Sequence, residues 1–185
     1  MNENSIYKKA LMLAVPMMIQ NGITNAVSLV DNLMVGSLGT ESMTGVSIVS
    51  QLLFVFFLAI FGGLSGPGIY GAQYFGRGNK EGYQNVFRLK MWIAAAITLA
   101  GMVAFIVAGK WMIGLYLHGN GGDIDAQETM QHGLDYLHVM LWGLIPFSVT
   151  QVYAGSLREL GESVKPMIGG ICSVVVDVVF NYLLI

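Results

Sequence analysis

The sequence predicts an all-α integral membrane protein built as a bundle of about five membrane-spanning helices. Of its 185 residues, 55% are hydrophobic and only 11% are charged, whereas about a quarter of the residues in soluble domains carry a charge. A helix needs about 20 apolar residues to cross about 30 Å of hydrocarbon, so the chain is long enough for five crossings with short loops. The 24 glycines are expected where helices pack closely in lipid.

The same composition argues against several other classes of protein. A formal net charge of −2 does not suit a nucleic-acid partner, which needs a basic surface. The single cysteine, Cys172, allows neither an internal disulfide nor a paired-cysteine metal site. The chain contains no Ser–His–Asp, His-Glu-x-x-His or phosphate-loop pattern, so we predict no catalytic residues, no enzyme activity and no organic cofactor.

Five apolar segments follow one another along the chain. They predict helices at about residues 10–35, 44–74, 87–108, 132–154 and 166–185. The first follows Lys8 and Lys9 but has no small-residue cleavage site after it, so it is expected to be retained as a helix. In the second, Pro67 predicts a kink or a local break. The fifth is still apolar at Ile185, so residues 1–185 are expected to be an N-terminal half-bundle that is incomplete at its C-terminus and partnered by the missing C-terminal half.

The basic residues predict how the bundle is oriented. Eight of the nine Lys and Arg residues precede the first helix, lie between the second helix and the first turn of the third, or lie between the fourth and fifth. With five spans, all these positions fall on one side of the membrane. The positive-inside rule then places the N-terminus in the cytoplasm of a multi-pass plasma (cell inner) membrane protein.

The first predicted helix is unusually polar along one face. At about 100° per residue, seven polar side chains fall within an arc of about 140°. They are Gln20, Asn21, Thr24, Asn25, Ser28, Asp31 and Asn32. Such a stripe must face protein or a water-filled cavity. We therefore predict that Gln20, Thr24, Asn25 and Ser28 line a substrate cavity, with Gln51 of the second helix extending it.

Two carboxylates in the predicted spans suggest a cation site. An ionised carboxylate in hydrocarbon costs at least about 2.5 kcal/mol, so it persists where it binds a cation or proton or lines water. Asp177 shares a face of the fifth helix with Ser173 and Asn181, at i, i−4 and i+4. Asp31 and Asp177 can together hold a monovalent cation or a proton, with neutral oxygens completing the shell. Alternatively, Asp31 lies solvated near the outer interface and Asp177 belongs to a polar clamp between helices.

Four stretches in order along the chain carry a family pattern. Residues 31–39 read Asp-Asn-Leu-Met-Val-Gly-Ser-Leu-Gly, and residues 72–79 read Ala-Gln-Tyr-Phe-Gly-Arg-Gly-Asn. Residues 157–161 read Leu-Arg-Glu-Leu-Gly, with Lys-Pro-Met at 165–167, and the chain ends Asp-Val-Val-Phe-Asn-Tyr-Leu-Leu-Ile at 177–185. Together these motifs resemble the MATE (multidrug and toxic compound extrusion) family of transporters, over essentially all 185 residues.

The resemblance implies a fold and a function. It implies that the chain is the N-terminal five-helix part of a twelve-helix (6+6) bundle. It also implies a Na⁺- or H⁺-coupled antiporter that exports small cationic or amphiphilic organic compounds, with Asp31, Asp177 and Asn181 at cation-site positions and no metal beyond Na⁺ at the two aspartates. Family members often have Asn first and Asp second in the fifth helix. Here the order is reversed, which leaves the coupling ion open.

Two other functions are compatible with the sequence. A lipid-linked oligosaccharide flippase of the same superfamily would have a more basic central cavity, whereas the first and fifth helices carry acids here. A truncated, non-transporting membrane protein would use the polar stripe only to hold helices together.

Overall fold

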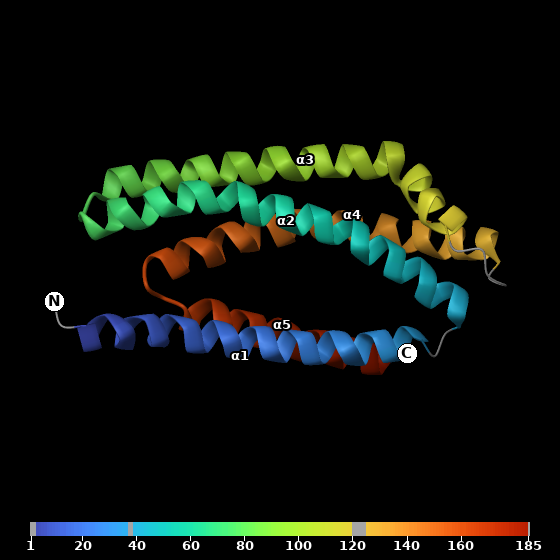
Figure 1. The fold of residues 1–185 in the computed structure, drawn as a ribbon, viewed down its shortest axis with the longest axis horizontal. Coiled ribbons are helices and arrows are strands. Elements are labelled where there is room, and N and C mark those ends of the chain that lie inside the picture. Colours follow the sequence, from blue (N-terminus) through green and yellow to red (C-terminus); the bar gives the residue numbers. More distant parts are fainter. Residues whose placement is uncertain (1–2, 37–38, 120–124, 185) are drawn as a thin grey trace. The chain divides into compact units, whose positions relative to one another are not determined.

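Five helices make up the part of the chain that the computed structural model describes, residues 3–36, 39–119 and 125–184 (Figure 1). They are α1 (Glu3–Gly36), α2 (Thr40–Gly76), α3 (Lys80–Gly119), α4 (Ala126–Glu159) and α5 (Val164–Leu184). The all-α prediction is confirmed. Four helices, α1 to α4, are long and apolar enough to cross a membrane, and α5 forms where a fifth helix was predicted.

The helices are longer than their apolar segments predicted. The largest difference is in α3, which has 40 residues where the apolar pattern predicted residues 87–108. Hydropathy marks the part of a helix that matches hydrocarbon, whereas backbone hydrogen bonding continues through polar flanks until a cap or a turn ends the helix. α2 continues through Pro67 without a break, so of the two predicted alternatives only the kink stays a prediction. Neighbouring groups in membrane helices commonly satisfy the carbonyl that a proline leaves unpaired.

The chain divides into two compact units. The first combines residues 1–34 with residues 154–185, and it therefore contains α1, the end of α4 and α5. The second, residues 35–153, contains α2, α3 and most of α4. Each unit has its own packing.

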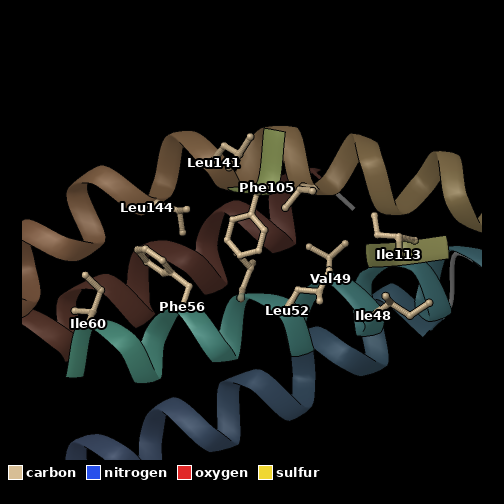
Figure 2. Packing of buried hydrophobic residues seen from close by; sticks show 11 residues of the cluster. Ile48, Val49, Leu52, Phe56, Ile60, Phe105, Ile113, Leu141 and Leu144 are labelled. Atoms are coloured by element: carbon tan, nitrogen blue, oxygen red, sulfur yellow. The ribbon is translucent and has the colours of Figure 1, made fainter. Parts of the chain in front are cut away.

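The core of the second unit is a shared cluster of aliphatic and aromatic side chains (Figure 2). The ring of Phe56, from α2, lies 6.5 Å from that of Phe105, from α3, between centroids. Leu141 and Leu144 of α4 belong to the same buried cluster. Three helices thus bury one apolar face each in a single core.

Small residues let α2 and α4 approach closely in this unit. A Cβ atom on Gly45 would lie 2.8 Å from the backbone oxygen of Thr129 and 2.9 Å from the backbone nitrogen of Gly133. Thr129 and Gly133 are four residues apart, so they lie on the same face of α4. This is the small-residue contact by which membrane helices gain close van der Waals packing.

The turn between α2 and α3 is a glycine-dependent helix cap. Gly78 has a φ of +71° and donates its N–H to the oxygen of Phe75 at 2.9 Å, while the N–H of Asn79 reaches the oxygen of Tyr74 at 3.0 Å. This pair of bonds is a Schellman motif, which satisfies carbonyls at the end of a helix. The Asn79 Oδ1 atom then accepts the N–H of Gly82 at 2.9 Å, which caps the start of α3.

The turn between α4 and α5 repeats this construction. Gly161 has a φ of +83° and donates to the oxygen of Arg158 at 3.0 Å, and Glu162 donates to the oxygen of Leu157 at 2.9 Å. Both turns lie within the sequence stretches that resemble the MATE family, and each contains a basic residue of its stretch. Their glycines are needed for the positive φ that the motif requires.

Candidate functional site

The predicted site residues of α1 and α5 belong to the same unit. The two helices lie parallel to each other, with the same N-to-C direction (Figure 1). They approach closely at one glycine, since a Cβ atom on Gly170 would lie 2.5 Å from Nε2 of Gln20. This contact fixes the register of α5 along α1.

The register brings the predicted cation-site positions to nearby levels. Asp31 lies eleven residues beyond Gln20, and Asn181 lies eleven beyond Gly170, so both are about 16 Å further along their helices. Asp177 lies seven residues beyond Gly170, about 10 Å along α5. The two acids are therefore separated by about 6 Å along the helix axes.

The helical period also places these positions on the faces that meet. At about 100° per residue, Asp31 lies about 20° around α1 from Gln20. Asp177 lies about 20° to one side of Gly170, and the backbone of Asn181 lies about 20° to the other. Because Gln20 and Gly170 touch, the acid-bearing faces of α1 and α5 are turned toward one another.

The two acids differ in exposure. Asp31 is half-buried, while Asp177 and its neighbour Ser173 are exposed in this chain. Over the described ranges, no three His, Cys, Asp or Glu side chains gather into a group that could hold a metal ion. The oxygen-bearing groups at these positions are two carboxylates together with neutral hydroxyl and amide groups. Such a donor set suits a proton or a hard monovalent cation better than a transition metal.

The hydroxyl groups of the α1 stripe are oriented by their own helix. The Oγ1 atom of Thr24 donates to the backbone oxygen of Gln20 at 3.0 Å, and the Oγ atom of Ser28 donates to that of Thr24 at 3.1 Å. With its proton committed, each hydroxyl can present only lone pairs to a ligand. This favours cations and hydrogen-bond donors over anions along the stripe.

Gln20 has a structural contact that sequence reasoning missed. It is half-buried, and its Oε1 atom lies 3.4 Å from the donating Nη2 of Arg158, at the end of α4. The residue thus connects α1 with both α4 and α5. The one available signal was the Gly169–Gly170 pair, since adjacent glycines in a membrane helix often mark a close approach.

The other residues predicted to line the cavity are Asn25 and Gln51. Asn25 is exposed on α1, on the same stripe as Thr24 and Ser28. Gln51 is exposed on α2, in the second unit. The assignment of these residues to a substrate cavity stays a prediction, as does the assignment of Asp31, Asp177 and Asn181 to a cation site.

Comparison with known proteins identifies the family of this chain. The MatE family model matches residues 16–183. The chain belongs to the MatE family. The resemblance seen in the four sequence motifs is thereby confirmed, and the family's multi-pass membrane fold agrees with the helices described above.

The curated relatives of this MatE chain carry names from drug resistance. It is 24% identical over 178 residues to the multidrug resistance protein MdtK of Pectobacterium atrosepticum, covering 96% of this chain and 37% of the relative. It is 25% identical over 175 residues to the probable multidrug resistance protein NorM of Synechocystis, covering 95% and 36%. The chain therefore spans little more than a third of the length of these relatives. No solved structure matches it significantly.

Proposed function

We propose that this MatE chain is part of a cation-coupled antiporter that exports small cationic or amphiphilic organic compounds, with Na⁺ or H⁺ as the coupling ion. The relatives named as multidrug resistance proteins support the export of drugs. The observation that supports the coupling is the contact between Gln20 of α1 and Gly170 of α5, because the helical rise from this contact puts the positions of Asp31 and Asp177 at nearby levels.

The proposed mechanism is a competition for negative charge. A carboxylate held in a membrane bundle is stabilised when a cation or proton neutralises it. Binding of the coupling ion would favour one packing of α1 against α5, and a cationic substrate on the α1 stripe would favour another. Each ligand shifts the equilibrium between the two packings only by the difference of its affinities for them. Coupling therefore requires that ion and substrate use the same acids.

The orientation follows from the charged turns. Arg77, at the α2–α3 turn, and Arg158, at the α4–α5 turn, lie on the side that the positive-inside rule assigns to the cytoplasm. In this orientation the N-terminus is cytoplasmic, in the plasma membrane. The two Schellman motifs then brace the cytoplasmic ends of the helices.

Dye export from reconstituted vesicles tests the proposal. The full protein, including any segment that completes the length of its relatives, is reconstituted and given either a Na⁺ gradient or a pH gradient. Asp31→Asn and Asp177→Asn should each lower gradient-driven export of a cationic dye by about tenfold or more, since each removes charge that the ion must neutralise. The gradient that drives the wild type identifies the ion.

Matched substitutions separate loss of coupling from loss of charge. Asp135→Asn and Glu81→Gln remove exposed acids outside the α1–α5 pair and should leave export within about twofold of the wild type. If both Asp31→Asn and Asp177→Asn keep wild-type coupled export, the two acids have no part in transport.

A further inference from the structure

A groove is formed entirely by helices of the second unit. It is bounded by α3 over residues 91–102 and by α4 over residues 145–149, and it encloses about 250 Å³. That is below the roughly 300–1,000 Å³ of clefts that hold drug-sized ligands. Leu99, Ile145 and Val149 line it and remain exposed in this chain.

The walls of the groove offer no spare hydrogen-bond donors from their hydroxyl groups. Thr98 and Ser148 are the two hydroxyl residues that line it, and both are buried. The Oγ1 atom of Thr98 donates to the oxygen of Ala94 at 2.7 Å, and the Oγ atom of Ser148 donates to that of Ile145 at 2.8 Å. The remaining lining is aliphatic or thioether. An alkyl chain fits such a surface because it has no polar atom to desolvate.

The length of the groove matches one leaflet. From Met91 to Met102 the rise along α3 is about 16 Å, which is half of the roughly 30 Å hydrocarbon core. Trp92 is 75% exposed at the end nearer the α2–α3 turn, where an aromatic side chain is typical of the membrane interface. The groove therefore runs from the interface toward the middle of the bilayer.

A cationic side chain stands at the interfacial end of the same face. Arg88 lies within about 20° of both Ala95 and Leu99 around α3. It is exposed, and within the described part of the chain no acidic side chain is at salt-bridge distance from it. Arg77 and Lys80 are also exposed at this end and outnumber the exposed Glu81. This end attracts a negatively charged headgroup.

We propose that the α3–α4 groove binds one acyl chain of an anionic phospholipid whose phosphate contacts Arg88. The groove supplies the apolar contact and the helix face leads from it to the guanidinium, which is suited to phosphate. The groove is lined by none of the acids of the proposed transport mechanism, so its proposed role is that of a specific lipid site.

Native mass spectrometry of the full protein in detergent tests the proposal with two lipids of identical acyl chains, phosphatidylglycerol and phosphatidylcholine. The wild type should retain phosphatidylglycerol about fivefold more tightly, the preference expected of one basic contact. Arg88→Gln should abolish this preference, weakening phosphatidylglycerol more than phosphatidylcholine, because the choline ammonium already offsets the charge of the phosphate. Ala95→Leu should weaken both lipids about tenfold, because roughly two methylene groups no longer fit in the groove.

Two variants on exposed positions of α3 serve as matched controls. Lys110→Gln removes a cation at the opposite end of the helix, and Ala104→Leu adds the same side chain about 180° around from Ala95. Both should bind as the wild type does. The proposal is overturned if the wild type shows no preference, if either control matches its paired variant, or if glycerol phosphate without acyl chains displaces the lipid.

Discussion

Gly170 of α5 lies so close to Gln20 of α1 that a Cβ atom on the glycine would be 2.5 Å from Nε2 and 3.1 Å from Cδ of the glutamine. The contact has a consequence beyond packing, because it sets the levels of Asp31 and Asp177 along the two helices. A site shared by two helices is only as well defined as the register between them. The small residue at this crossing therefore belongs to the proposed coupling site, although it carries no chemistry itself.

Substitution of this glycine should loosen the α1–α5 pair. Gly170→Val forces the helices apart or displaces Gln20, and we expect it to lower the free energy of unfolding by about 1–3 kcal/mol and to reduce dye export. Thermal unfolding in detergent measures the first effect. Gly169→Val places the same side chain where no atom lies within 4 Å, so it should be far milder. Equal losses in the two variants would show that helix propensity, rather than the contact, is responsible.

A second close approach involves backbone on both sides and should tolerate even less. At Gly45, a Cβ atom would meet the oxygen of Thr129 and the nitrogen of Gly133 at under 3 Å, and neither can rotate away. Gly45→Ala should therefore cost about 1–3 kcal/mol of stability. Gly62→Ala, on the same helix with nothing within 4 Å, should be neutral or stabilising by up to about 1 kcal/mol. The comparison fails if both variants unfold at the same temperature.

Sequence reasoning predicted the number and order of the helices because hydropathy reports directly on burial in lipid. It placed their ends poorly because ends are set by local hydrogen bonds that hydropathy does not report. The end of α2 is an example: Gly78 and Asn79 form a Schellman motif there, two residues beyond the last helical residue, Gly76. The apolar pattern of this segment fades earlier, near residue 74.

The candidate site was predictable one helix at a time. Periodicity placed Asp31 on the polar face of α1, and it placed Asp177 and Asn181 on one face of α5. It could not show that these faces meet, because the pairing depends on Gly170 touching Gln20, a contact between residues 150 positions apart. The bond from Arg158 to Gln20 was hidden for the same reason.

The α4–α5 turn provides a test at a position that requires a positive φ. Gly161→Ala should destabilise the protein by about 1–2 kcal/mol, the cost of the left-handed conformation for a residue with a side chain. It should also speed hydrogen exchange at the amide of Glu162, which donates to Leu157. Gly155→Ala, in helical α4 with no atom within 4 Å, is the matched control and should not destabilise. Unchanged exchange at Glu162 in Gly161→Ala would contradict the assigned role of this glycine.

The proposal that Asp31 and Asp177 share one ion predicts how the double variant should compare with the single variants. If both acids bind the same cation, removing either one already abolishes tight binding, so Asp31→Asn with Asp177→Asn should lose little more coupled export than either single variant. Groups that act as a unit show this non-additivity. Titration calorimetry with Na⁺, or proton release measured on adding a cationic dye, gives a readout independent of transport. Multiplicative losses in the double variant would mean two separate sites, and the single-ion mechanism would then be wrong even if export itself persists.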